Sequence, residues 1–159
     1  MRTIAIPALS AADVERFWSY VDKAGDCWQW TAGTNNYGYG RFGLNGKRYL
    51  AHRVAHQIAN GTIAEGLVVD HICLNRRCVR PAHLHAVTIK QNLERRAGAA
   101  ADSKSGVRGV YFQDGSWVAE VRSNGRLAYR ERFSCIDAAA LAVASARQRI
   151  FTNIEELAA

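Results

Sequence analysis

The pattern of hydrophobic and polar positions predicts three short helices in the first hundred residues. Over residues 10–24, apolar positions recur at helical spacing behind Ser10, a good N-cap residue. The second helix is expected over residues 51–60, where Gly61 ends it, and the third over residues 89–96. Each segment can pack one face against a core.

Alternation of hydrophobic and polar positions predicts strands between these helices. A β-hairpin is expected over residues 41–50, because the Asn45-Gly46 dipeptide at its centre is a strong signal for a tight turn. Farther on, the apolar run over residues 67–69 predicts a short strand that carries Asp70 and His71 at its end.

A second pattern of strands follows residues 97–106, whose small and polar side chains are typical of a linker. The expected elements are strands over residues 109–113, 116–122 and 127–133 and an alanine-rich helix over residues 138–151. Asp137 is expected to cap this helix. Cys135 is expected to be a small buried side chain.

These elements predict an α+β chain of two modules. The first module, residues 1–96, contains the hairpin and the three helices. The second, residues 107–152, is a small three-stranded antiparallel sheet backed by one helix, and residues 97–106 join the two.

The charge of the chain indicates the kind of partner that it binds. Its 159 residues include 21 Lys and Arg against 14 Asp and Glu, a net charge of +7. The excess is shared by both modules and favours a polyanionic partner, most commonly nucleic acid. No apolar run approaches the roughly 18 residues of a membrane helix, and the N-terminus lacks the layout of a signal peptide. We therefore expect a soluble, intracellular protein.

Candidate metal ligands are concentrated in residues 70–92, which contain the carboxylate of Asp70, three imidazoles, two thiols and the carboxamide of Asn92. This density suits metal ligation far better than core filling. Cys73, Cys78 and His83 are spaced as three loop-borne ligands of a structural Zn²⁺. We therefore expect a zinc site in this stretch.

A tetrahedral zinc site needs a fourth ligand, and three side chains compete for that place. Cys27 is the best candidate, because it would fasten the N-terminal segment to the site. His85 is the rival, and Cys135 comes third because it belongs to the other module. A zinc ion held in any of these ways would staple a small domain with long irregular loops.

His71, Asp70 and Asn92 suit a different task. Hydrolysis of a DNA phosphodiester needs a general base and a hard divalent cation, and an imidazole supplies the base near neutral pH. The Asn92 carboxamide and the Asp70 carboxylate suit Mg²⁺, which prefers oxygen ligands. These residues predict a hairpin followed by a helix that hold the cation against DNA.

The motif Asp70-His71, Pro81, His83-Leu84 and Asn92 resembles HNH endonucleases of the ββα-metal superfamily. The offsets from His71 to the two cysteines, the histidine and the asparagine that follow are similar to those of His-Cys box homing endonucleases. The resemblance implies His71 as the general base, Asn92 as a ligand of the catalytic Mg²⁺, and Cys27, Cys73, Cys78 and His83 as ligands of a structural zinc.

The chain departs from that pattern at two positions. Many HNH enzymes have an asparagine that orients the base just before the proline, and here that position is Arg80. Asp70 need not bind metal, because His-Cys box enzymes use the asparagine as their main protein ligand. A basic residue near the scissile phosphate is also expected, and Arg48 or Arg41 can serve. Together with Lys47 these arginines make the hairpin either a solvated basic ribbon or one that lies along DNA.

The second module resembles the AP2 DNA-binding domain in the spacing of residues 105–110 and 117–119, Phe133 and residues 138–140. In that family the exposed sheet face enters the major groove. The resemblance makes DNA contacts of Arg108, Trp117, Arg122 and Arg130.

Together these features predict a site-specific DNA endonuclease of the phage or mobile-intron type, with Mg²⁺ as catalytic ion, Zn²⁺ as structural ion and double-stranded DNA as substrate. The rival from another class is a non-catalytic, zinc-stapled DNA-binding regulator, which Arg80 favours. A protein that binds or cleaves RNA is less favoured, because the chain lacks an RNP-type aromatic signature. A monomer would nick DNA, and a homodimer would cut both strands at a near-palindrome.

Overall fold

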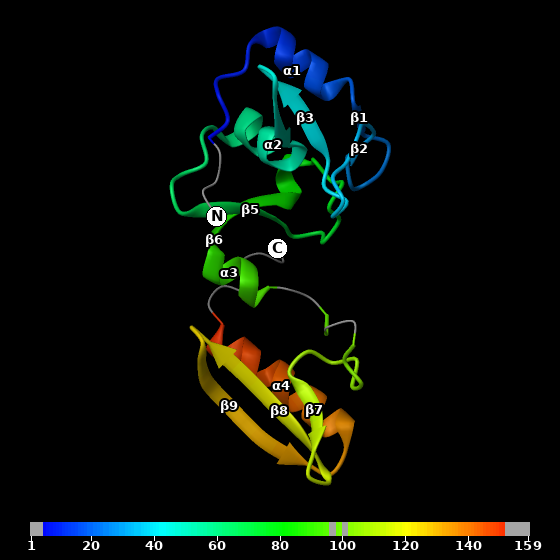
Figure 1. The fold of residues 1–159 in the computed structure, drawn as a ribbon, viewed down its shortest axis with the longest axis vertical. Coiled ribbons are helices and arrows are strands. Elements are labelled where there is room, and N and C mark those ends of the chain that lie inside the picture. The colour runs from blue at the N-terminus through cyan, green and yellow to red at the C-terminus, as the bar shows by residue number, and fades with distance from the viewer. Residues whose placement is uncertain (1–4, 96–97, 100–101, 152–159) are drawn as a thin grey trace. The chain divides into compact units, whose positions relative to one another are not determined.

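The computed structural model describes residues 5–95, 98–99 and 102–151. The chain divides into two compact units, Met1–Ile89 and Lys90–Ala159, each with its own core (Figure 1). The mixed α+β class with small antiparallel sheets is confirmed. The module boundaries at 96 and 107 stay a prediction, and Arg96 and part of the expected linker lie outside the described residues.

The first unit is built from short elements whose strands pair two by two, all antiparallel: β1 with β2, β3 with β4 and β5 with β6. In chain order its elements are α1 (Ala11–Trp18), β1 (Val21–Asp22), β2 (Gln29–Trp30), β3 (Arg41–Leu44), β4 (Lys47–Leu50), α2 (Ala51–Asn60), β5 (Leu67–His71), the 3₁₀ helix η1 (Pro81–His83) and β6 (Leu84–Thr88).

Helix α1 begins as predicted and ends earlier than predicted. Ser10 and Asp13 form a reciprocal capping box, each side chain bonded to the other's backbone N–H at 3.2 Å. The helix stops at Trp18, not at Ala24, because the carbonyl of Tyr20 accepts the N–H of Thr31 at 2.9 Å. That bond draws the following residues into the β1–β2 ladder.

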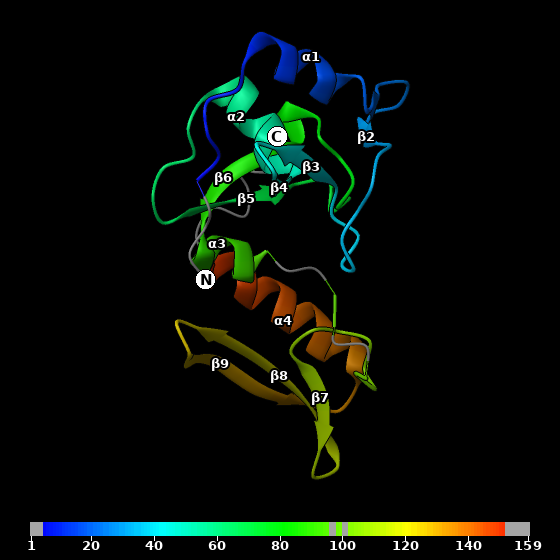
Figure 2. The same ribbon diagram turned by 45° about the horizontal axis from the view of Figure 1, so that its top comes forward.

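The predicted hairpin and the helix after it are both confirmed. Asn45 and Gly46 have φ angles of 50° and 72°, so both central residues of the turn are left-handed, as a type I′ turn requires. Strand β4 leads directly into α2, and the N–H of Gly61 bonds to the carbonyl of Gln57 where α2 ends. Figure 2 shows α2 beside the β3–β4 hairpin and the β5–β6 ladder.

The core of the first unit is centred on three aromatic rings from three elements. Phe17 of α1 lies 5.1 Å from Trp30 and 5.2 Å from Phe42, measured between ring centroids. Val54 of α2 and Val69 of β5 belong to the same buried cluster. Burial of these side chains fixes the strand that carries Asp70 and His71.

The second unit is a three-stranded antiparallel sheet in the order β7-β8-β9 with a long helix on one face. Its elements are β7 (Val110–Gln113), β8 (Ser116–Ser123), β9 (Arg126–Phe133) and α4 (Ile136–Ile150), while α3 (Ile89–Glu94) begins at the last residue of the first unit. The core between sheet and helix includes Val121, Val143 and Ala146.

Two expectations for the start of α4 are corrected. The N-cap residue is Cys135, and Asp137 lies inside the first turn, where its charge favours the helix N-terminus. Cys135 is exposed instead of buried, because it stands at the surface turn ahead of the helix.

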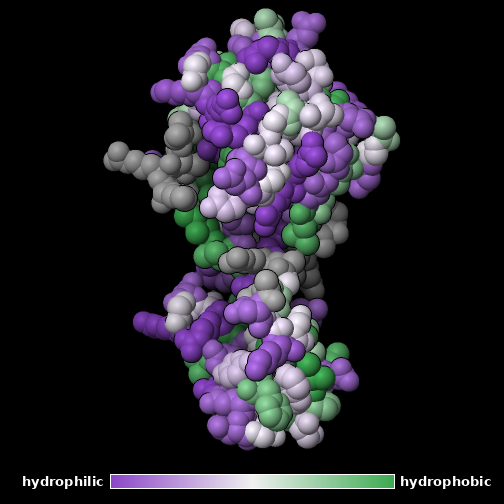
Figure 3. All heavy atoms as spheres, turned by 45° about the vertical axis from the view of Figure 1, so that its right-hand side comes forward, coloured by the Kyte–Doolittle hydropathy of each residue, from purple (hydrophilic) through white to green (hydrophobic). Residues whose placement is uncertain are grey.

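Hydrophilic side chains cover much of the visible surface of each unit, and hydrophobic ones gather in small separate groups (Figure 3). Among the residues that the structure describes, no helix combines the length and the apolar character needed to cross a membrane.

Candidate metal centre and active site

The structure brings together the four side chains that the sequence predicts as zinc ligands. Cys27 comes from the β1–β2 loop, Cys73 and Cys78 from the loop after β5, and His83 from the end of η1. Their potential ligand atoms all lie within 4.8 Å of one another. Among the described residues, no other group of three or more Cys, His, Asp or Glu side chains is close enough to hold a metal ion.

The spacing of these four donors fits a tetrahedral zinc site. Zinc bonds of about 2.3 Å to sulfur imply tetrahedron edges of roughly 3.7 Å. Nδ1 of His83 lies 3.6 Å from Sγ of Cys78 and 3.8 Å from Sγ of Cys27. Three thiols and one imidazole are also the donor set that zinc prefers. The group therefore could bind zinc, with Cys27 in the fourth place, while His85 lies on β6 opposite Asp70.

Burial sets the protonation of the thiols in this group. It raises the pKa of Cys78 to about 12, and it also raises the pKa of Cys73. Metal ligation requires thiolates, so a cation that binds here has to displace the thiol protons.

The loop that carries Cys73 and Cys78 is held by hydrogen bonds to backbone carbonyls of the β1–β2 hairpin. The N–H of Val79 donates to Trp28 O at 2.8 Å, and the Arg77 guanidinium donates to Trp30 O at 2.9 Å. These bonds bring the β1–β2 loop, with Cys27, against the loop that carries the other ligands.

Arg80 has a definite task in this arrangement. Its guanidinium donates to the backbone carbonyl of Asp26 at 2.8 Å and also pairs with the Asp26 carboxylate. That carboxylate lies 3.7 Å from Nε2 of His83, the ring nitrogen opposite the thiols. A carboxylate behind a ligating imidazole orients the ring, so Arg80 and Asp26 support the metal group from outside.

His71 lies at the end of β5, only 5% exposed, with its ring held by a bond to the cysteine loop. Its Nε2 is 3.0 Å from the carbonyl oxygen of Cys78. Because a carbonyl only accepts, Nε2 carries the hydrogen in the neutral ring, and Nδ1 is the basic nitrogen. Burial lowers the pKa of His71, while the Cys78 bond and the Asp70 charge oppose that shift. The ring is therefore neutral at neutral pH.

Two further rings lie against His71. The ring centroid of His52 is 4.5 Å away, and that of Tyr39 is 5.9 Å away. The Arg76 guanidinium lies 5.5 Å from the Tyr39 ring and donates to Tyr37 O at 2.9 Å. Neither Tyr39 nor Arg76 is predicted from the sequence, because only the path of the loops brings them to the site.

The remaining predicted residues of the nuclease site are on the β3–β4 hairpin, on β5 and on α3. The side chains of Arg41, Lys47 and Arg48 are exposed on the β3–β4 hairpin. Asp70 is half-buried on β5, whereas Asn92 is half-buried on α3 in the second unit. Their joint role in holding Mg²⁺ stays a prediction.

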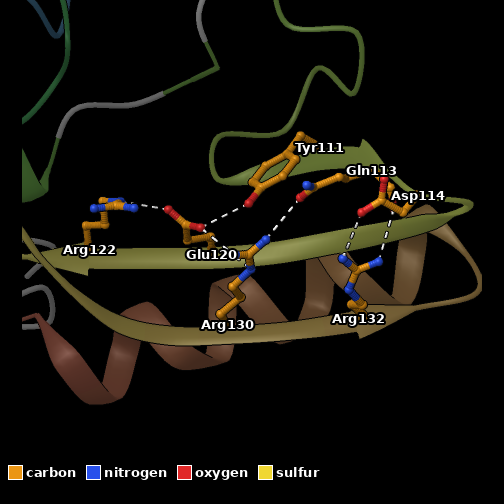
Figure 4. A network of polar contacts seen from close by, with 7 residues as sticks. All are labelled: Tyr111, Gln113, Asp114, Glu120, Arg122, Arg130 and Arg132. Carbon is orange, nitrogen blue, oxygen red and sulfur yellow. Dashed lines mark hydrogen bonds and ion pairs between the residues drawn. The ribbon is translucent and has the colours of Figure 1, made fainter.

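Two of the four residues predicted to contact DNA in the second unit lie on the open face of its sheet. Arg122 and Arg130 stand there in a network with Glu120 (Figure 4). Trp117 instead lies on the other face and packs against the core under α4. Arg108 turns inward and donates to the carbonyls of Leu93 and Glu94 at 3.1 and 3.3 Å, where it caps α3.

The chain is similar to a known protein family and to several phage proteins. The sequence model of the family described as HNH endonuclease matches residues 49–94. Protein 7.7 of Escherichia phage T7 is 45% identical over 69 residues, which are 43% of this chain and 53% of that protein. The uncharacterised gene 5.3 protein of Enterobacteria phage T3 is 34% identical over 73 residues, 39% of this chain and 72% of that protein. The chain belongs to the HNH endonuclease family.

The family match and most of the metal group fall on the same part of the chain. The matched segment contains His71, Asn92 and three of the four members of the metal group, and Cys27 precedes it. Protein 2.8 of phage T7 is also similar, 38% identical over 68 residues, 42% of this chain and 45% of that protein. The chain spans about half the length of these two T7 relatives, and no solved structure matches it.

Proposed function

We propose that the protein is a divalent-metal-dependent DNA endonuclease in which His71 is the general base. The observation that carries the proposal is the bond from Nε2 of His71 to the carbonyl of Cys78. It leaves Nδ1 as the basic nitrogen of a neutral imidazole, and it does so within an HNH domain. In this proposal the Cys78 carbonyl has the orienting role of the missing asparagine, which weakens the support that Arg80 gives to a non-catalytic regulator.

The proposal gives the two metal sites different tasks. Cys27, Cys73, Cys78 and His83 would hold a structural Zn²⁺ that fixes the loop from which His71 is oriented. Asn92 and Asp70 would hold Mg²⁺, which stabilises charge on the phosphate and on the leaving oxygen. An exposed arginine of the hairpin, Arg48 or Arg41, would contact the phosphate.

The open face of the second unit would supply much of the DNA binding. Arg122, Arg130 and Arg132 are presented there by strands, and their guanidinium groups are held by neighbouring polar side chains (Figure 4). Pre-ordered guanidinium groups on a sheet suit the phosphates and guanine edges of duplex DNA. A separate binding face of this kind, and relatives from phages, support a site-specific enzyme of the homing type.

The experiment is cleavage of supercoiled plasmid and linear phage DNA by the purified protein with Mg²⁺, beside EDTA and a His71→Ala variant. We expect metal-dependent cutting by the wild type, at least about 100-fold slower cutting by the variant, and DNA affinity within about twofold. Nicked product indicates a monomer, and linear product indicates paired subunits. Cutting by His71→Ala at the wild-type rate would show that His71 is not the base.

A further inference from the structure

His52 is the buried side chain nearest to the proposed base that the proposed function does not use. It is the second residue of α2, it is 4% exposed, and its ring centroid lies 4.5 Å from that of His71. Burial, the largest cause, lowers the pKa of His52 well below its ordinary value. The ring is therefore neutral and has one nitrogen that can accept a hydrogen bond.

Nδ1 of His52 is buried and has no hydrogen-bond partner among the residues that the structure describes. A buried polar atom without a partner is energetically costly, so such atoms in folded proteins usually bind ordered water. Nδ1 of His71 is also available, because its Nε2 bonds to Cys78 O. One water can hydrogen-bond to two nitrogens that lie up to about 5.8 Å apart. The rings of His52 and His71 have centroids 4.5 Å apart, which is compatible with such a bridge.

We propose that His52 and His71 hold one water molecule between their Nδ1 atoms, and that this water is the nucleophile of the hydrolysis. The inference rests on the proposed function and extends it to a second catalytic residue. Two acceptors occupy both hydrogens of the water, which leaves an oxygen lone pair for the phosphorus. Tyr39, whose ring lies 5.4 Å from that of His52, closes one side of the place where the water sits.

The step balances without a further reactant. The water gives one proton to Nδ1 of His71 while its oxygen bonds to phosphorus, and its other hydrogen stays donated to Nδ1 of His52. The bond from phosphorus to the 3′-oxygen breaks, and that oxygen takes a proton from solvent. His52 keeps its protonation state throughout, and its task is to aim the attacking oxygen.

The same helix supplies a matched control. His56 lies one turn farther along α2, is 7% exposed and also has a buried Nδ1 without a partner in the described part of the chain. No ring contact joins it to His71 among those that the structure describes. His52 and His56 thus share a buried Nδ1, and they differ in the ring contact with His71, which only His52 has among the contacts described. A change at His56 therefore controls for the loss of a buried histidine on α2.

The test compares four variants in plasmid cleavage with Mg²⁺: His52→Ala, His52→Phe, His52→Asn and His56→Asn. Asparagine places a polar atom where the imidazole has Nδ1, whereas phenylalanine keeps the ring and removes the nitrogen. We expect kcat to fall roughly 10- to 100-fold in His52→Ala and His52→Phe, with KM within about twofold. His52→Asn should recover most of kcat, and His56→Asn should match the wild type.

Zinc content and thermal unfolding show whether each variant is folded, and the Asn and Phe variants decide the matter if the Ala variant is not. Equal kcat for His52→Asn and His52→Phe, or wild-type kcat for His52→Phe, would overturn the proposal. A second readout does not need cleavage. Side-chain ¹⁵N spectra should show the Nδ1 resonance of His71 shifted by His52→Phe and unmoved by His56→Asn.

These measurements distinguish the two levels of the proposal. A wild-type protein that cuts no DNA would contradict the proposed function alone, provided that the His71 resonance still responds to His52→Phe. An unmoved resonance in a folded His52→Phe variant would overturn the shared water, whether or not the wild type cuts DNA.

Discussion

Cys78 contributes to two sites at once through different atoms. Its thiol belongs to the metal group, and its backbone carbonyl holds the ring of His71. The ring of His71, the proposed base, is therefore oriented by the loop that carries the metal group, and a change that displaces this loop should affect both sites. Arg80 and Asp26 extend this connection outward to His83.

The metal group gives the sharpest prediction at this scale. We expect Cys78→Ser to lose the bound zinc and to lower the unfolding midpoint of the first unit, because a structural zinc site contributes folding free energy directly. Zinc content by elemental analysis and a thermal melt check this. Cys135→Ser is the matched control, an exposed cysteine outside the group. Equal zinc content in both variants would remove the thiol of Cys78 from the site.

The buried His52 predicts how stability depends on pH. The pKa of His52 is lowered in the folded state, chiefly by burial. Below a pH of about 6.5 the unfolded chain therefore binds a proton at His52, whereas the folded chain does not. The stability due to the neutral ring is complete above that pH and is lost as pH falls, by at most about 1.4 kcal/mol per unit. Urea unfolding between pH 7.5 and 5.5 should show a smaller decline in His52→Gln. Parallel declines would contradict this.

Sequence spacing was sufficient to predict which side chains form the metal group, and it was insufficient to predict the residues around that group. Thiols and imidazoles at short intervals have few other uses, so Cys73, Cys78 and His83 stand out in the sequence. Tyr39 and Arg76 reach the site through loops whose paths depend on backbone bonds, and no local pattern marks them. Trp117 was predicted on the open face, but its register places it under α4.

At the scale of elements, the tight turn from Gly109 into β7 should be sensitive to a single methyl group. Gly109 has a φ of 80°, and a Cβ there would stand 2.5 Å from the carbonyl of Glu120 and 3.1 Å from the Arg147 guanidinium. We expect Gly109→Ala to destabilise the second unit by about 2–4 kcal/mol, from backbone strain and overpacking together.

Gly115 provides the comparison for this change. Its φ is 77°, and a Cβ there would meet nothing within 4 Å, so Gly115→Ala should cost only the strain, about 1 kcal/mol. Chemical denaturation of both variants measures the difference. Equal losses would mean that the backbone of β8 gives way to the added methyl group.

Elements with strong local signals were predicted well, and those fixed by pairing were not. Asn45-Gly46 identified the hairpin, and Gly61 identified the end of α2. The end of α1 was misplaced, because Tyr20 and the residues after it exchange backbone bonds with the segment around Thr31. Such pairing joins Tyr20 to Thr31, Val21 to Trp30 and Asp22 to Gln29, and it leaves no trace in helical periodicity.

At the scale of the whole molecule, the net charge of +7 should appear in the salt dependence of DNA binding. If Arg122 on the open face contacts a phosphate, Arg122→Ala lowers the affinity for duplex DNA and reduces the slope of log K against log salt by about 1. Arg149→Ala is the control, because it removes the same charge from α4 on the opposite face of the sheet. Titration of labelled duplex at several salt concentrations checks this, and equal effects would exclude a specific contact at Arg122.

The crowding of three sulfur atoms has a consequence for the conditions under which the proposed enzyme would work. Sγ atoms of Cys27, Cys73 and Cys78 lie within 4.8 Å of one another, so an oxidant that displaces the metal can join two of them as a disulfide. Oxidation would then release the loop that aims His71. We expect diamide to abolish cleavage and a thiol reductant with added zinc to restore it, which would make DNA cutting depend on the reducing power of the surroundings.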